Sequence, residues 1–531
     1  MEVFLHNRLL LLGFLLVFYV YGLHYCYGAP KKTVGLHEFD PSPEPSYLNF
    51  GISLLNRTSF PPGFLFGAST SSYQVEGGWN ADGKGLSNWD YFTHKYPEKI
   101  ANCSNGDVAA DSYHRYKEDI KLLNDMNADS YRFSISWSRV IPSGRICQGI
   151  NENGIQYYNN LIDELLANQI TPMVTIFHWE LPQALEDDYG GFLSPAIISD
   201  YHDYVNLCFE RFGDRVKIWI TFNEPFTYSM YGYDSGETAP GRCSSWVNPN
   251  CAGGDSGVEP YIVSHHQLLA HANATHLYRT RYQQQGIIGM ANVAIWMVPL
   301  TNKPSDQRAA IRALDFIYGW FMNPLVFGDY PEEMKILVGD RLPRFTQDQS
   351  ELLKGSYDFH ALNYYTALYA SAPVNASDPN CPRYSTDKHV DLSATRFGVP
   401  IGEQAASDWL HIYPRGIYHL LLYIKRKYGN PVIYITENGV DDVNNASLPL
   451  VLALQDRFRI RYHYRHLQFI RRAIEKGVQV KGYYGWSLID NFEWQDGYTF
   501  RFGINYVDFE TLQRFRKLSS LWFERFLSRM N

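Results

Sequence analysis

The chain has 531 residues, 45% of them hydrophobic, with a formal charge of -8 at pH 7 and a pI near 6.1. This hydrophobic content over this length can bury a large core, which excludes an intrinsically disordered chain. Nucleic acid and anionic membrane surfaces require a basic face on their partner, so we expect neither as the main ligand. A neutral small molecule fits the charge better.

The first 28 residues have the layout of a secretory signal peptide. Arg8 precedes an apolar run over residues 9–20, and small residues follow at Gly28 and Ala29. Because the apolar run is short for a membrane span, we expect residues 1–28 to be removed and no membrane attachment afterwards, with an uncleaved anchor as the alternative. The expected route is the secretory pathway, ending outside the cell or in a vacuole.

After this leader, a polar segment over residues 29–55 precedes one predicted domain over residues 56–531, since no linker or low-complexity stretch interrupts the rest. Cys243 and Cys251 lie in the loop-like stretch "GRCSSWVNPNC" and are the predicted disulfide, while the pairing of the other cysteines stays open. Predicted N-glycosylation sites are the Asn-x-Ser/Thr triplets at Asn56, Asn102, Asn273, Asn375 and Asn445.

Eight short apolar runs recur along the predicted domain. They begin at Gly63, Asp129, Ile170, Val216, Ile287, Tyr357, Val432 and Val480. Amphipathic stretches such as "YYNNLIDELLANQ" and "FRIRYHYRHLQFIRRAIEKG" lie between several of them. This alternation predicts an α/β fold, a single (β/α)8 TIM barrel with long βα loops. A doubly wound open sheet competes, but the chain has no G-x-G-x-x-G after the first run and no G-x-x-x-x-G-K-[ST] motif.

Two of the predicted strands end in a glutamate beside an asparagine. "IWITFNEPF" ends the fourth run at Glu224, and "PVIYITENGV" ends the seventh at Glu437. Both would face the mouth of the barrel, where active sites of this fold lie. Pro225 predicts an extended backbone at Glu224, and Gly439 predicts a sharp turn after Glu437.

Paired carboxylates across a pocket are what glycosidic bond cleavage needs. One protonates the departing oxygen, and the other meets the positive charge that develops at the anomeric carbon. A separation of about 5 Å permits a covalent intermediate, whereas roughly 6.5 to 9.5 Å leaves room for a water. A salt bridge or a helix cap is the structural alternative for each glutamate.

Several longer motifs point to one family. They are "FPPGFLFGASTSSYQVEGGW", "YRFSISWSR", "FHWELPQALED", "TFNEP", "LNYYT", "ITENG" and "GYYGWSLIDNFEWQDGYTFRFGINYVD". From about Asn56 to Phe526 the chain resembles glycoside hydrolase family 1, and in particular its plant β-glucosidases. The resemblance implies retaining hydrolysis of small plant glucosides through a covalent glucosyl-enzyme intermediate. It makes Glu224 the acid/base and Glu437 the nucleophile.

A transglucosidase with the same intermediate is the alternative enzyme, and a homo-oligomer is left open. The charge of Glu437 is expected to raise the pKa of Glu224 above the ordinary glutamate value of about 4.3. Arg132 and Tyr365 match positions that contact the nucleophile, where Arg132 would keep it ionised. Positions matching those that bind the sugar or stack on the aglycone are Gln74, His178, Asn223, Trp486, Glu493, Trp494 and Trp409.

Two other features complete the sequence-based predictions. Gly485 stands where the family commonly has a larger small residue, so we hypothesise that it widens the region near the sugar. The helix-like stretch "VSHHQLLAHA" carries His265, His266 and His271 without the spacing or acidic partner of a metal site, so we interpret them as packing residues and predict no metal and no cofactor.

Overall fold

A computed structural model describes residues 55–282, 286–374, 378 and 380–529. The chain divides into two units, Met1–Gly51 and Ile52–Asn531, and the described residues all belong to the second. The predicted signal peptide and most of the polar segment therefore lie outside the described residues. None of the helices in the described ranges combines the length and the hydrophobicity that crossing a membrane requires.

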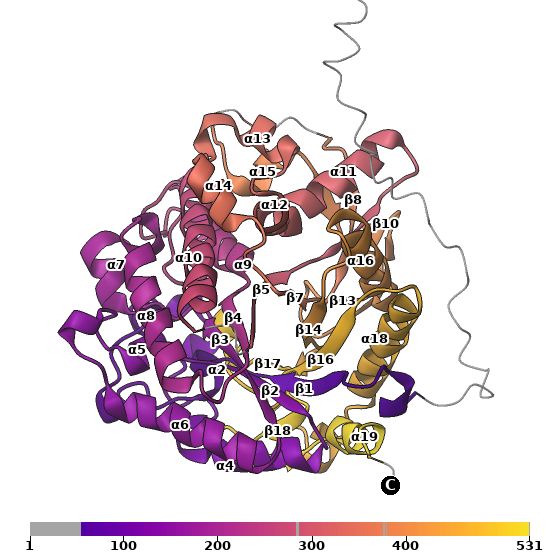
Figure 1. Cartoon of the computed structure of the whole chain (residues 1–531). Coiled ribbons are helices and arrows are strands. Elements are labelled where there is room, and N and C mark those ends of the chain that lie inside the picture. Colours follow the sequence, from indigo (N-terminus) through magenta and orange to yellow (C-terminus); the bar gives the residue numbers. More distant parts are fainter. Residues whose placement is uncertain (1–54, 283–285, 375–377, 379, 530–531) are drawn as a thin grey trace, which may run out of the picture. The chain divides into compact units, whose positions relative to one another are not determined.

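Eight parallel strands close into a barrel in the order β1-β16-β14-β7-β5-β4-β3-β2, as the (β/α)8 prediction requires (Figure 1). Each falls within one of the eight predicted runs. Their bounds are β1 (Leu65–Ser69), β2 (Ser130–Ser134), β3 (Thr171–Phe177), β4 (Ile218–Asn223), β5 (Ile287–Val293), β7 (Phe359–Asn363), β14 (Ile433–Asn438) and β16 (Val480–Trp486).

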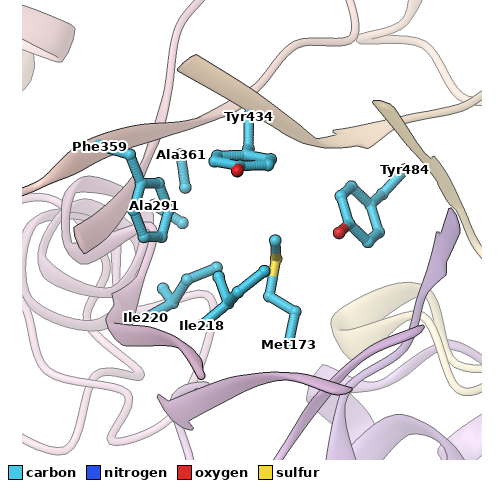
Figure 2. Packing of buried hydrophobic residues seen from close by; sticks show 8 residues of the cluster. All are labelled: Met173, Ile218, Ile220, Ala291, Phe359, Ala361, Tyr434 and Tyr484. Carbon is cyan, nitrogen blue, oxygen red and sulfur yellow. The ribbon is translucent and has the colours of Figure 1, made fainter. Parts of the chain in front are cut away.

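Apolar side chains from six of these strands fill the barrel interior, so the barrel is a packed core below its mouth. Figure 2 shows them converging: Met173, Ile218, Ile220, Ala291, Phe359, Ala361, Tyr434 and Tyr484. All eight are 9% exposed or less, which explains why the strands read as nearly continuous apolar runs.

Helices follow the strands and surround the barrel (Figure 1). The predicted amphipathic stretches are confirmed as α6 (Glu152–Ala167) and α18 (Arg457–Glu475). The other long helices are α4 (Ser112–Asp125), α8 (Ile197–Phe212), α10 (Glu259–Arg281), α11 (Pro304–Leu314) and α16 (Pro414–Lys427). The shorter ones are α2 (Ser72–Val75), α3 (Asn88–Lys95), α5 (Trp137–Val140), α7 (Gln183–Tyr189), α9 (Pro225–Met230), α12 (Trp320–Phe327), α13 (Glu332–Val338), α14 (Gln347–Leu353), α15 (Tyr384–Asp387), α17 (Leu450–Ala453) and α19 (Leu518–Phe526).

The long loops after the strands carry short accessory strands. These are β6 (Trp296–Pro299), β8 (Ala367–Ser371), β9 (Asp391–Ser393), β10 (Thr395–Arg396), β11 (Val399–Pro400), β12 (Glu403–Gln404), β13 (His411–Ile412), β15 (Asp442–Val443), β17 (Phe500–Arg501), β18 (Asn505–Val507) and β19 (Arg514–Arg516). The loop after β4 contains the predicted disulfide, which joins Cys243 and Cys251 with their Cα atoms 5.5 Å apart. These loops build the walls of a pocket over the barrel mouth.

Candidate active site

Irregular pairing near the carboxyl ends of β4 and β14 aims the site residues inward. On β4, three steps from Ile220 to Asn223 match two steps on β5. On β14, two steps from Ile435 to Glu437 match one step on β7, which places Glu437 opposite Asn363. An extra residue in a strand reverses which face the following side chains occupy. The bulges therefore bring Asn223 and Glu437 to the mouth.

Both carboxylate oxygens of Glu437 are held by protein donors. The Arg132 guanidinium donates from Nη1 to Oε1 at 2.5 Å, and the Tyr365 hydroxyl donates to Oε2 at 2.7 Å. Arg132 is fully buried, so this charge-assisted hydrogen bond lies in a medium that screens it weakly. Burial, followed by the charge of Glu437, raises the pKa of Tyr365 well above its usual range, so the phenol remains a donor.

Glu224 lies across the pocket at the start of α9. Its φ is +42° and its ψ 62°, so the prediction that Pro225 holds it extended is wrong. The left-handed conformation lets the Glu224 amide donate to the Ala291 carbonyl at 2.8 Å while Pro225 begins the helix. Asn363 Nδ2 donates to Oε1 and Thr227 Oγ1 donates to Oε2, each at 2.7 Å.

The pKa of Glu224 is raised to about 7, first by burial and then by the charge of Glu437. Glu437 therefore acts in the predicted direction, but desolvation in the pocket is the larger cause. The hydrogen bonds from Asn363 and Thr227 act against this rise. A carboxylic acid that keeps its proton near neutral pH is suited to general acid catalysis.

A chain of hydrogen bonds fixes the tautomer of His178. Asn223 Oδ1 accepts from Arg132 Nη2 at 2.6 Å and from Asn363 Nδ2 at 3.0 Å, which leaves Asn223 Nδ2 to donate to His178 Nε2 at 3.0 Å. Burial lowers the pKa of His178 well below its usual range, so the ring is neutral and carries its proton on Nδ1. That buried Nδ1 has no protein partner and is a free donor in the pocket.

A glycine is required at position 439 for a different reason from the predicted turn. A Cβ at this position would lie 1.9 Å from the Trp486 carbonyl oxygen, and the residue does not adopt a left-handed conformation. Close approach of β14 to the end of β16 therefore requires the glycine. This contact seats the residue after the "TEN" triplet against the strand that carries Trp486.

Aromatic side chains form the remaining walls. Trp486 and Trp494 line the pocket, each ring stacked near His178 with 6.0 Å between centroids. Trp409 also lines the pocket and is 45% exposed, which places it at the rim. Tyr231, Thr238 and Gln495 line it as well.

Gln74 and Glu493 form a pair of which only Glu493 faces the pocket. Gln74 is fully buried behind it, and its Nε2 donates to Asn491 Oδ1 and to the Phe492 carbonyl, both at 2.8 Å. Glu493 lines the pocket, and its buried Oε1 has no protein partner. Glu493 therefore offers a free acceptor, while Gln74 holds the backbone that carries it.

Sequence reasoning missed Asn363, Thr227 and Trp179. Asn363 bridges Asn223 and Glu224 through one amide nitrogen, and Trp179 Nε1 donates to the Asn223 carbonyl at 2.8 Å. A signal for Asn363 was present, because it ends an apolar run with an amide as Asn223 does. Thr227 lies in the first turn of α9. It reaches the Glu224 carboxyl group because the helix begins directly after Glu224.

Replacing Asn363 with Ala should move the alkaline limb of the pH–activity profile to higher pH. The lost hydrogen bond lowers the pKa of Glu224 in the intact protein, so its removal raises that pKa and the acid stays protonated further up the scale. We also expect kcat/KM to fall roughly tenfold as positioning is lost. Thr227→Val should shift the limb in the same direction, and a shift to lower pH in both variants would contradict this assignment.

The hypothesis that Gly485 widens the sugar region is wrong. A Cβ there would meet Ile504 Cδ1 at 2.7 Å and His463 Cε1 at 3.6 Å, on the side of the strand away from Trp486. We expect Gly485→Ala to leave the preference between a monoglucoside and a 6-O-substituted diglycoside unchanged. Overpacking against Ile504 should lower the free energy of unfolding by about 1 kcal/mol, measured by chemical denaturation. A changed preference would restore the hypothesis.

The remaining sequence-based sites are outside the pocket. Asn102 and Asn445 are exposed, Asn56 and Asn273 are half-buried with Asn273 inside α10, and Asn375 lies outside the described residues. In α10, His265, His266 and His271 bond to Tyr330, Phe192 and Thr221, respectively. Within the described ranges no cluster of three or more His, Cys, Asp or Glu side chains is arranged to hold a metal ion.

Comparisons with known proteins agree with this geometry. A family model described as "Glycosyl hydrolase family 1" matches residues 56–531. "Beta-glucosidase 12" of Oryza sativa subsp. indica is 56% identical over 487 residues, 91% of this chain and 95% of that protein. "Isoflavonoid 7-O-beta-apiosyl-glucoside beta-glycosidase" of Dalbergia nigrescens is 55% identical over 476 residues, 89% of this chain and 86% of that protein.

The solved structure of a rice Os3BGlu6 β-glucosidase mutant in a covalent complex with Glc matches with a TM-score of 0.88 and 47% identity, covering 89% of this chain and 100% of that chain. Two carboxyl groups facing one pocket at the mouth of a (β/α)8 barrel, together with these relatives, identify a glycosidase. The chain belongs to glycosyl hydrolase family 1, as its motifs indicated.

Proposed function

We propose that this glycosyl hydrolase is a retaining β-glucosidase that acts on small plant glucosides. The observation that carries the proposal is the asymmetry of its two carboxyl groups. Glu437 accepts hydrogen bonds from a guanidinium and a phenol, whereas burial raises the pKa of Glu224 to about 7, which suits it to donate a proton. The plant β-glucosidases among its relatives support the substrate class.

In the first step, Glu437 attacks the anomeric carbon while Glu224 gives its proton to the departing oxygen. The bond from the anomeric carbon to the aglycone breaks, a glucosyl ester forms on Glu437, and the aglycone leaves as an alcohol. The rotamer fixed by Arg132 and Tyr365 orients the attacking oxygen, so little entropy is lost in reaching the transition state.

In the second step, the ester has removed the charge of Glu437 and with it one cause of the raised pKa of Glu224. Glu224 gave up its proton in the first step. Its pKa is now lower than in the free enzyme, so it is ionised and can accept a proton. It takes a proton from an incoming water whose oxygen attacks the anomeric carbon, and Glu437 leaves as a carboxylate. Two displacements return the β configuration.

Free polar atoms support recognition of sugar hydroxyls. His178 Nδ1 is a donor and Glu493 Oε1 an acceptor, both buried at the pocket wall without a protein partner. Unpaired buried polar atoms cost free energy that a hydroxyl-bearing ligand relieves. The Trp486 ring supplies an apolar face for sugar C–H groups.

The test is the configuration of the first product. The enzyme is mixed with an aryl β-D-glucoside, and proton NMR follows the anomeric signals before mutarotation. We expect β-glucose first, and with added methanol methyl β-glucoside as well, whose share measures the transglucosidase alternative. Initial α-glucose would reject retention, and no turnover of any β-glucoside would reject the proposed function.

We also propose that the protein enters the secretory pathway and reaches the apoplast or the vacuole. The signal-like order of residues 1–28 and the disulfide of Cys243 and Cys251 support this proposal. N-terminal sequencing of protein isolated from its source should begin after the apolar run of residues 9–20. A retained Met1 would contradict it.

A further inference from the structure

The pocket is lined by acidic side chains and not by basic ones. Four of its lining residues carry a carboxyl group, and none of the lining residues that the structure describes is Lys or Arg, although Arg132 pairs with Glu437 from behind. Two of the four, Glu224 and Glu437, are used by the proposed chemistry, and Glu493 faces the sugar. The fourth, Asp496, has no role in either displacement, and neighbouring Glu237 adds its charge to the same region.

The two outer carboxyl groups, Asp496 and Glu237, have no basic partner among the described residues. Neither Asp496 nor Glu237 forms an ion pair or a side-chain hydrogen bond within the described part of the chain. Asp441 is 1% exposed and does not line the pocket; its Oδ2 accepts from the Ser407 amide at 3.0 Å, and its Oδ1 is buried without a partner.

The carboxyl groups of this region shift one another's pKa. Burial, then the carboxylates of Asp441 and Glu237, raises the pKa of Asp496 to about 6. Burial, then Asp441 and Asp496, raises the pKa of Glu493 well above its usual range. Each ionised group thus raises the free energy of the others, and a cation among them would offset that repulsion.

The charged region lies where a departing aglycone passes. Tyr231 lines the pocket, and burial, then the charges of Glu237, Glu224 and Asp496, raises its pKa to about 12, so this phenol is near both the acid/base and the outer carboxyl groups. Trp409, Phe500 and Phe502 line the same pocket. Aromatic faces beside carboxylates suit an aromatic group that bears a positive charge.

We infer that the aglycone site selects glucosides whose aglycone carries a cationic nitrogen beside an aromatic ring, with Asp496 and Glu237 as its specificity-determining residues. The inference rests on the proposed β-glucosidase function, since it names the substrate class of that same site. Asp496 lines the pocket directly, whereas Glu237 is exposed and acts through its charge at the mouth.

The test compares two glucosides of matched shape, 4-(trimethylammoniomethyl)phenyl and 4-(2,2-dimethylpropyl)phenyl β-D-glucoside. Each is titrated by tryptophan fluorescence into Glu437→Gln, so that binding is measured without turnover. We expect the cationic glucoside to bind about tenfold tighter at low salt and the ratio to shrink as salt is added. Adding Asp496→Asn or Glu237→Gln to this variant should each reduce the ratio.

Glu210→Gln is the matched control, because it removes one exposed carboxylate on α8 away from the pocket and should leave the ratio unchanged. Equal binding of the two glucosides, or a ratio that both pocket variants leave unchanged, would overturn the inference. Glu237 is exposed, so its variant keeps the test valid if Asp496→Asn does not fold. Hydrolysis of the neutral glucoside by the unaltered enzyme tests the proposed function separately.

Discussion

Glu437→Gln is expected to lower kcat for an aryl β-glucoside by three orders of magnitude or more. An amide is a poor nucleophile and carries no charge to meet the developing positive charge at the anomeric carbon. Gln is nearly isosteric with Glu, so Arg132 and Tyr365 keep a neighbour of the same shape and the fold should survive. The measurement is steady-state kinetics with a chromogenic glucoside, with thermal unfolding to confirm folding.

Replacing Glu437 with the shorter Ala identifies the role of the side chain as well as its importance for activity. In Glu437→Ala, added azide should attack the anomeric carbon from the face that the carboxylate occupied and yield α-glucosyl azide. Rescue that gives only the β-azide would mean that Glu437 is not the nucleophile. A Glu437→Gln enzyme that keeps more than about a tenth of the activity would contradict the assignment outright.

The loss of activity in Glu224→Gln should depend on the leaving group. For an aglycone that leaves poorly, loss of the general acid should cost about 10² to 10⁴ in kcat/KM. For a highly acidic leaving group such as dinitrophenol the first step needs no proton, so release of the phenol should be much less affected. The unaltered enzyme should lose activity as pH rises through about 7, because its acid then deprotonates.

Glu224→Gln should not show this loss of activity as pH rises through about 7, since Gln does not titrate. Azide added to Glu224→Ala should give β-glucosyl azide, because it intercepts the ester on Glu437 from the opposite face. Equal losses for good and poor leaving groups, or an unchanged alkaline limb, would exclude Glu224 as the acid/base.

The fold was predictable because its signals are local. Each barrel strand is a nearly continuous apolar run, and helices such as α18 keep a 3.6-residue period. Glu224 and Glu437 were placed at the mouth because the carboxyl ends of barrel strands all meet there. The family motifs then assigned the two roles.

The orientation of the site residues was not predictable from the strand pattern. Tyr434 points into the core, so a simple alternation of two would turn Glu437 outward. The bulge against β7 reverses this, and it depends on pairing that a single sequence does not display. Likewise, alternation from Ile220 would send Asn223 outward, and pairing with β5 corrects it.

Local rules also failed where tertiary contacts decide the backbone. Pro225 disfavours helical dihedrals at Glu224, but the contact with Ala291 selects the left-handed region rather than the extended one. Gly439 is explained by the Trp486 carbonyl that approaches it, and Gly485 by the packing of Ile504 outside the barrel. In each case the partner lies on another strand or loop.

The most direct test is to trap the intermediate. The enzyme is treated with 2,4-dinitrophenyl 2-deoxy-2-fluoro-β-D-glucoside, digested and mapped by mass spectrometry, because the fluorine slows release of the sugar from the ester. We predict one fluoroglucosyl group per chain, on the peptide that contains Glu437, and no label in Glu437→Gln. Label on Glu224, or complete turnover to inverted sugar without any labelled peptide, would contradict it.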